Sequence, residues 1–223
     1  MKVIGSPEIA TTQNDDKGKQ VVEALNKKMY IGHYAATKAE AKDLALSLIP
    51  AGATVGFGGS VTTRELGLVE ALRDKGHEVF DHWERGLTGE EILDIRYKQA
   101  VSDYFLTSAN AITLAGEIIN VDGFGNRVAA SIFGPKNVIM VVGINKITQD
   151  LSEALERSQH IAAVKNAQRL NSSTPCNSTG ECSDCDSPGR ICNISVVLHR
   201  KPGGGGQTGG EYHVILVGEE IGF

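Results

Sequence analysis

Apolar residues recur along the chain at two spacings, and the first is the spacing of a helix. Val21, Val22, Leu25 and Met29 lie three to four residues apart and form a one-sided stripe. Two later segments begin with a threonine followed three residues on by a glutamate, the sequence of a capping box. These patterns predict helices over 15–28, 37–48, 60–75, 88–102, 128–133 and 150–170.

The second spacing is that of strands. The run NVIMVV at 137–142 is continuously apolar, as expected of a strand that is buried on both faces. Similar runs predict strands over 54–57, 78–80, 104–109, 111–114, 116–121, 194–199 and 212–217. The last two are separated by the insert KPGGGGQTGGE at 201–211, which is predicted to be the mobile tip of a hairpin.

The order of these elements predicts an α/β fold. We expect a mostly parallel, Rossmann-like sheet with helices on both faces and antiparallel additions near the C-terminus. Ligands of such sheets lie at the carboxyl ends of the strands, so the turns after Phe57, Ala109 and Val142 are expected to meet in one crevice. Residues 1–16 are expected to be a flexible N-terminus before a single domain at 17–223.

Composition and charge narrow the function. The chain has 223 residues, of which 41% are hydrophobic and 22% charged, with a net charge of −5. The acidic balance argues against nucleic acid as a partner, because no stripe of lysine and arginine exists to neutralise phosphates. No apolar run approaches the length of a membrane span, and the first residues lack the apolar core of a signal peptide. We therefore expect a cytoplasmic protein.

The turn TVGFGGSVTT at 54–63 is the first candidate binding site. A buried strand ends in Gly58 and Gly59, and Ser60, Val61 and Thr62 then open a helix. Glycines clear side chains from the approach, while free backbone N–H groups and hydroxyls at a helix start attract small anions. Glycine-rich turns of this kind also occur for packing alone, so the motif by itself does not decide between the two.

A longer block is more specific. SANAITLAGEIINVDGFGNRVAASIFGPKNVIMVVGINKI at 108–147 strongly resembles the LUD (lactate utilisation) domain family. The resemblance covers residues from about 17 to 223, in the short form without a ferredoxin-type domain. It is carried by 109–112, 116–117, 122–123, 125–127, 134–135 and 142–146, and also by 58–62, Arg157, Asn166, Arg169 and 222–223.

The resemblance implies a fold related to the superfamily of ribose-5-phosphate isomerase, glucosamine-6-phosphate deaminase (NagB/RpiA-like) and CoA transferase. In that superfamily the first glycine turn holds a phosphate or a CoA-type group. Some members of the LUD family belong to an assembly that oxidises L-lactate to pyruvate. We therefore expect a small anionic metabolite as ligand, with redox partner subunits or further copies of the chain as protein partners.

The residues of this block suggest a carboxylate site. Arg127 is expected to pair with a carboxylate such as that of lactate, with Asn110 and Asn126 beside it. Glu117 is a candidate base or, by analogy with CoA transfer, a nucleophile. Each of these residues also has a plain structural interpretation as a turn former or surface ion pair, and Lys146 is either an anion ligand or a solvated lysine.

All four cysteines lie in one polar segment, as C-x5-C-x2-C-x6-C. Thiolates on such a loop can wrap one ion or cluster, and we expect a metal centre at Cys176, Cys182, Cys185 and Cys192. An iron–sulfur cluster tolerates the irregular spacing. Structural zinc usually shows two C-x-x-C pairs rather than one, and disulfides or free thiols are a third alternative.

Three functions are consistent with these features. The first is a redox accessory subunit of 2-hydroxy acid oxidation with a four-cysteine centre and an anion site. The second is a stand-alone metabolite enzyme of the isomerase or CoA-transferase type. The third is a non-catalytic binding module with structural zinc.

Overall fold

The computed structural model describes residues 7–203 and 210–223, with side chains from residue 14 onward. Its centre is a six-stranded sheet in which every neighbouring pair of strands is parallel. The order across the sheet is β1 (Ile31–Ala35), β10 (Tyr212–Val217), β7 (Asn137–Gly143), β4 (Tyr104–Thr107), β2 (Val55–Phe57) and β3 (Val79–Phe80). The predicted α/β fold with a mainly parallel sheet is confirmed.

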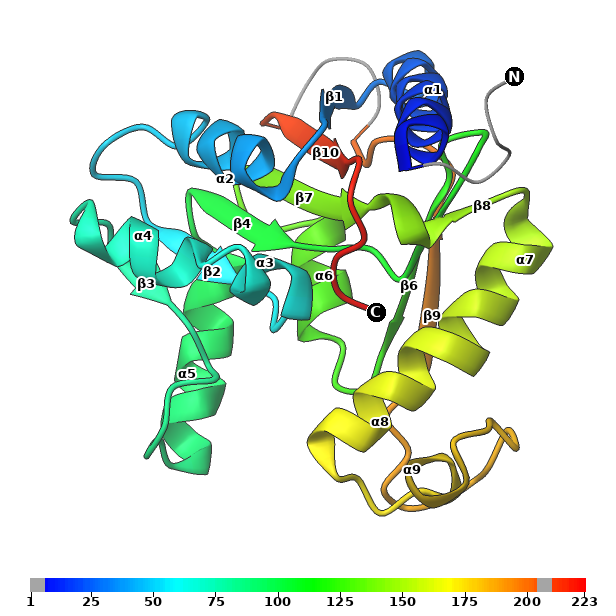
Figure 1. Cartoon of the computed structure of the whole chain (residues 1–223). Coiled ribbons are helices and arrows are strands. Elements are labelled where there is room, and N and C mark those ends of the chain that lie inside the picture. Colours follow the sequence, from blue (N-terminus) through cyan, green and yellow to red (C-terminus); the bar gives the residue numbers. More distant parts are fainter. Residues whose placement is uncertain (1–6, 204–209) are drawn as a thin grey trace.

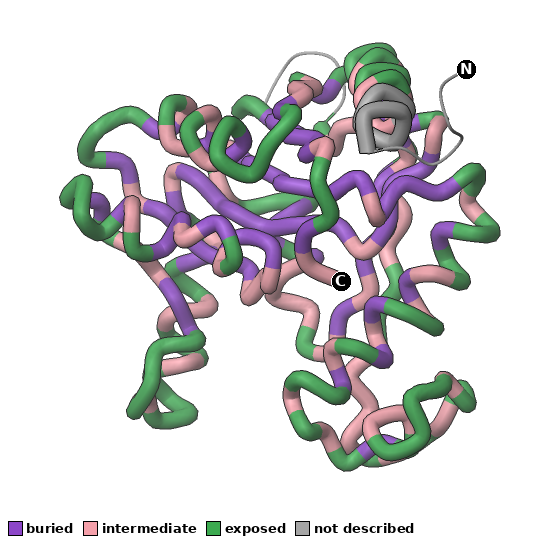
Figure 2. The backbone as a smooth tube through the Cα atoms, in the orientation of Figure 1, coloured by how far each residue is buried: buried purple, intermediate pink, exposed green. Residues whose placement is uncertain are grey.

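The central strands are buried on both faces, which explains their continuous apolar runs. In β7, Ile139 and Val141 pack into one core, and Val138, Met140 and Val142 pack into another on the opposite face. Because side chains alternate along a strand, each face takes every second residue. Figure 2 shows these strands as the most continuously buried part of the chain.

Helices cover both faces of this sheet (Figure 1). The first core is closed by α2 (Lys38–Ser47) and α4 (Leu68–Asp74), and the second by α1 (Pro7–Lys27) and α6 (Asn126–Ile132). The remaining helices are α3 (Val61–Glu65), α5 (Gly89–Ala100), α7 (Leu151–Glu156), the π-helix η2 (Arg157–Ala163), α8 (Val164–Leu170), α9 (Pro175–Thr179) and the 3₁₀ turn η1 (Ile144–Lys146).

A second, mixed sheet lies beside the first. Its order is β8 (Ile147–Thr148), β5 (Ala111–Thr113), β6 (Ile118–Asp122) and β9 (Ile194–Leu198). The pairs β5–β6 and β6–β9 are antiparallel, and β5–β8 is parallel. One face of this sheet shares the second core, and the other packs against α7. The antiparallel pairing therefore starts in the middle of the chain as well as near its end.

The prediction of a C-terminal hairpin was wrong. β9 pairs with β6 in the second sheet, whereas β10 lies between β1 and β7 in the main sheet. The stretch 201–211 therefore connects two sheets instead of forming a hairpin tip, and its residues 204–209 lie outside the described part. Burial decided the pairing, since all six residues of β10 are buried and such a run needs neighbours on both edges and both faces.

Several element boundaries also differ from the prediction. Helix α1 begins at Pro7, so the expected flexible segment 1–16 is helical from there, and residues 1–6 lie outside the described part. The sequence analysis missed β1, and the predicted helix 60–75 is divided at Gly67, which has a left-handed backbone with φ of 61°. Within the described ranges, none of the helices is both long and apolar enough to cross a membrane.

Candidate functional site: a cationic pocket at the strand ends

Loops that follow three parallel strands meet in one cavity of about 80 Å³. Residues 59–62 follow β2, residues 108–110 follow β4, and Lys146 follows β7. Asn166 of α8 lies on the wall facing these turns, and the C-terminal Phe223 completes the lining. The structure thus brings together Gly59, Ser60, Val61, Thr62, Asn110 and Arg127 of the sequence-predicted residues in what we call the inner pocket.

Lys146 is the buried cation of the inner pocket. Only 3% of the residue is exposed, and its Nζ donates to Thr62 Oγ1 at 2.9 Å and to Ser108 Oγ at 3.0 Å. Burial, reinforced by the charges of Arg157 and Arg127, lowers the pKa of Lys146 to about 7. Among the described residues its short-range partners are hydroxyls, so no carboxylate neutralises it within 4 Å.

The sequence did not decide whether Lys146 is an anion ligand or a solvated lysine. Lys146 lies in the turn that follows β7, the most apolar strand, and therefore at the carboxyl end of a strand. This position favoured a place in the pocket over exposure to solvent. Ser108 was missed because nothing in its local sequence separates it from an ordinary strand-end serine.

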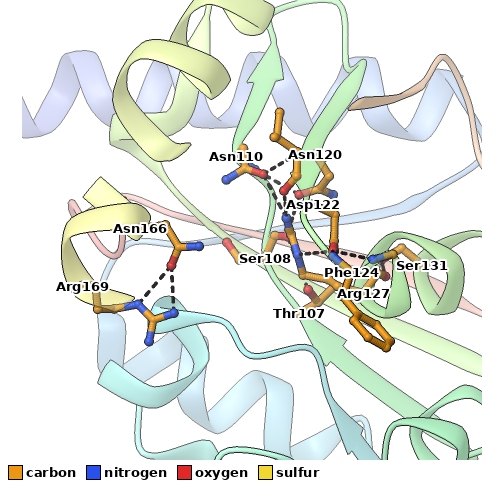
Figure 3. A network of polar contacts seen from close by, with 12 residues as sticks. Thr107, Ser108, Asn110, Asn120, Asp122, Phe124, Arg127, Ser131, Asn166 and Arg169 are labelled. Atoms are coloured by element: carbon orange, nitrogen blue, oxygen red, sulfur yellow. Dashed lines mark hydrogen bonds and ion pairs between the residues drawn. The ribbon is translucent and has the colours of Figure 1, made fainter. Parts of the chain in front are cut away.

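Arg127 is the organising residue beside the pocket (Figure 3). Its side chain is 16% exposed, and its nitrogens face acceptors in the protein. Nη1 donates to the Ser108 carbonyl and to Asn120 Oδ1, Nη2 donates to Asn110 Oδ1 and to the Val121 carbonyl, and Nε pairs with Asp122 Oδ2 at 3.4 Å.

This differs from the expectation that Arg127 grips a carboxylate in bidentate fashion. With its four Nη hydrogen bonds made and Nε paired with Asp122, such a grip would first have to break contacts inside the protein. Asn110 is held in the same network, because its Oδ1 also accepts from the Val121 N–H at 2.8 Å. Arg127 therefore fixes the loop after β4 and adds positive charge to the cavity that Lys146 also lines.

The glycine turn is required by close packing. A Cβ on Gly58 would lie 2.9 Å from Phe105 and Thr107 and 3.1 Å from Cγ of Arg127. Gly59 has a φ of 70°, and a Cβ there would lie 2.4 Å from Nε1 of Trp83. The turn thus lets Arg127 and Trp83 reach the site, and Ser60 caps α3 by accepting from the Thr63 N–H.

Side chains around the pocket are held in fixed orientations. Asn166 Oδ1 accepts two hydrogen bonds from Arg169, at 2.8 and 3.1 Å, which turns its amide nitrogen toward the cavity (Figure 3). Asn145 binds residues 221–223, which we call the C-terminal strap. Its side chain accepts from the Ile221 N–H and donates to the Gly222 carbonyl, both at 3.2 Å. These contacts hold the polar donors at the rim of the pocket in place, so a ligand would not have to order them on binding.

The inner pocket opens onto a larger cavity of about 330 Å³, which we call the outer groove. The two share Gly59, Arg127 and Asn166. Arg96, Arg169 and Arg190 add three further guanidinium groups, against Asp122 as the acidic residue of the lining. Two of these arginines stack on aromatic rings of the groove, Arg96 on Phe124 at 4.0 Å and Arg169 on Trp83 at 4.7 Å from the ring centroids.

Three predicted residues lie elsewhere. Gly58 and Asn126 line the outer groove instead of the inner pocket. Glu117 follows the turn between β5 and β6, at the opposite end of this hairpin from Asn110, and its carboxylate contacts Thr113 and His199. We therefore do not assign Glu117 to the chemistry of this site.

The four cysteines are free and half-buried, and they surround a separate small cavity. Among the residues that the structure describes, no three Cys, His, Asp or Glu side chains stand close enough to hold an ion together. The metal centre expected from the sequence therefore stays a prediction.

A parallel α/β sheet with a cationic pocket at its strand ends places the chain in the Rossmann-like α/β class, whose ligands lie at the carboxyl ends of the strands. A family model described as the LUD domain matches residues 18–217, so the chain belongs to the LUD domain family. Membership relates the chain to lactate utilisation. No curated protein matches the sequence.

The fold agrees with a solved structure. The chain is similar to a DUF162 family protein from Deinococcus radiodurans, with a TM-score of 0.52 and 18% identity. The alignment covers 92% of this chain and 98% of that one. At this identity the likeness shows a shared fold.

Proposed function

We propose that the inner pocket binds the carboxylate of a small 2-hydroxy or 2-oxo acid, such as lactate or pyruvate. The observation that carries this proposal is Lys146, a buried cation that faces a cavity and has hydroxyl partners in place of an acidic one. An unpaired buried charge is costly, so a ligand that supplies the opposite charge is favoured there. The volume suits a molecule of a few heavy atoms.

The surrounding groups would orient such an acid. Ser60 offers a hydroxyl donor to the carboxylate, and the Asn166 amide faces the same space. Thr62 and Ser108 would donate to it after giving up their bonds to Ser108 Oγ and to the Ala109 carbonyl. Lys146 would pair with the carboxylate in its protonated form, and the bound negative charge would raise its pKa above the value of about 7. Removing two electrons from a hydroxy acid also needs an oxidant, and these side chains do not accept electrons. The proposed role is therefore that of an accessory subunit to a redox partner.

Binding can be tested by calorimetry with lactate, pyruvate and the neutral analogue lactamide. We expect the two acids to bind and lactamide to fail, with Lys146→Met losing at least about tenfold in affinity. Lys75→Met, which removes an exposed lysine at the end of α4, is the matched control and should bind as wild type does. Equal heats for lactate and lactamide, or unchanged binding by Lys146→Met, would refute the proposal.

A second candidate function is favoured by the outer groove. Four arginines facing one acidic residue, with two aromatic rings beside them, match a larger ligand that carries phosphate groups. This supports the alternative of a metabolite enzyme of the CoA-transferase or isomerase type, with the acid end of its ligand in the inner pocket. Coenzyme A and inorganic phosphate are the probes, and Arg169→Ala should weaken both while Arg200→Ala, an exposed control, should not.

A further inference from the structure

The segment 171–193 is ordered without a core of its own. Among its residues only Thr174 is buried, and its regular structure is limited to the five residues of α9. A stretch of this length that buries so little apolar surface needs another source of stability, for which cross-links and metal ions are the usual solutions.

The four cysteines of this segment face the same space. Cys176 comes from α9, Cys182 and Cys185 from the loop after it, and Cys192 from the approach to β9, and all four line one cavity of about 20 Å³. The opposite wall is formed by Gln159 and other residues of the helical segment 159–164. Residues that serve only as small apolar groups would be buried in a core, whereas these thiols are half-buried around a gap.

The turn at Cys182–Cys185 already has features of a chelating loop. The Asp184 N–H donates to Sγ of Cys182 at 3.4 Å, and Gln159 Nε2 lies 3.6 Å from the same sulfur. Asp184 has a φ of 45°, an uncommon backbone state for a residue with a side chain, and it brings this N–H round toward the sulfur. N–H donors stabilise a sulfur that carries negative charge, which is its state when it binds a metal.

Arg190 ties this loop together. Its Nη1 donates to the Cys185 carbonyl at 2.6 Å, its Nε donates to the Cys192 carbonyl at 3.2 Å, and its Nη2 pairs with Asp184 at 2.9 Å. A guanidinium at this place offsets the negative charge that four thiolates would bring. Arg190 also lines the outer groove, so the cysteine cavity adjoins that groove.

We propose that Cys176, Cys182, Cys185 and Cys192 form a four-thiolate site for a thiophilic metal centre, either one zinc ion or one iron–sulfur cluster. Ligation would release the thiol protons and turn the four side chains toward the cavity centre. The proposal is independent of the carboxylate site, since it uses none of that site's residues. The proposal rests on two observations: the loop has no hydrophobic core of its own, and its four thiols line one cavity.

Metal content of the full chain purified without oxygen gives the direct test. Zinc bound at about one ion per chain in colourless protein, or iron with matching acid-labile sulfide and visible absorption, would each support the proposal and identify the metal. Wild-type protein from metal-replete cells that holds neither metal, and whose four thiols react freely with an alkylating reagent in the native state, would overturn it. Two disulfides found by mass spectrometry in the same preparation would also overturn it.

A variant pair localises the site. Cys182→Ser should lose most of the metal, whereas Ser183→Ala, which changes a neighbour lining the same cavity, should keep it. In wild type, a chelator should make 171–193 sensitive to protease while lactate binding at the inner pocket persists. Metal that remains in Cys182→Ser at the wild-type level would show that it binds elsewhere and would refute the assignment.

Discussion

The Nζ of Lys146 lies 2.9 Å from Oγ1 of Thr62, a residue 84 positions earlier in the chain. The contact joins the turn after β2 to the turn after β7, two strands that are separated in the sheet by β4. A lysine buried at this junction, with a pKa lowered to about 7, makes both the proposed carboxylate binding and folding depend on pH above neutrality.

The affinity for a small carboxylate should fall as pH rises above about 7. The anion favours protonated Lys146 and raises its pKa, so binding takes up a proton between the pKa values of the free and the bound states. We expect affinity to be constant below pH 7 and to weaken by up to about tenfold per pH unit above it. Calorimetry in buffers of different ionisation enthalpy measures the proton uptake, and uptake in Lys146→Met equal to that of wild type would contradict the assignment.

Lys146→Met should stabilise the protein at and below neutral pH. The folded-state pKa of about 7 lies below the ordinary value of 10.5, so the unfolded chain binds more protons between these values. The free energy of unfolding of wild type therefore rises with pH across this window, and the cost of burying the charge is fully present below pH 7. The variant lacks that cost, on the order of 5 kcal/mol at pH 6.5.

Urea unfolding of both proteins at several pH values checks this prediction. The advantage of Lys146→Met should shrink as pH rises from 7 to 10.5, because Lys146 is neutral in both states only above the ordinary pKa of 10.5. A difference between the two proteins that stays constant with pH would mean that Lys146 is not a buried charge.

Replacing Arg127 should impair folding as well as binding. Arg127→Ala removes the cationic partner of Asp122 and one of the two hydrogen bonds that each side-chain oxygen of Asn110 and Asn120 accepts, at an expected cost of about 3–5 kcal/mol in the free energy of unfolding. Arg127→Lys should not restore it, because one ammonium cannot serve five acceptors. Denaturant unfolding measures both variants, and a loss below about 1 kcal/mol would show that the network contributes little.

Gly222→Ala should block the inner pocket. A Cβ on Gly222 would lie 2.3 Å from Thr62 Oγ1 and 3.0 Å from Lys146 Nζ. Gly76→Ala is the matched control, since its φ of 82° is likewise left-handed but a Cβ there meets nothing within 4 Å. Both variants should lose about 1–2 kcal/mol of stability from backbone strain. Only Gly222→Ala should weaken lactate binding, and equal affinities would place the ligand away from the C-terminal strap.

Local patterns in the sequence determined most elements of the fold. The apolar run of β7, the capping boxes at Thr37 and Thr88 and the glycine turn after β2 predicted strands and helices at their observed places, because these signals depend on residues a few positions apart. The parallel α/β class followed from their order. The rule that ligands lie at the carboxyl ends of strands placed the pocket near the correct turns.

The tertiary structure decided which side chains face one another. Arg127 was expected to hold a ligand, yet its guanidinium contacts five acceptors of the protein that the fold brings close to it. Glu117 lies at the far end of the β5–β6 hairpin, away from the pocket. Burial of Lys146 and the separation of β9 from β10 depend on contacts between residues distant in the chain. Such contacts set the dielectric surroundings, the partners and the pKa of a group, and no pattern of neighbouring residues contains that information.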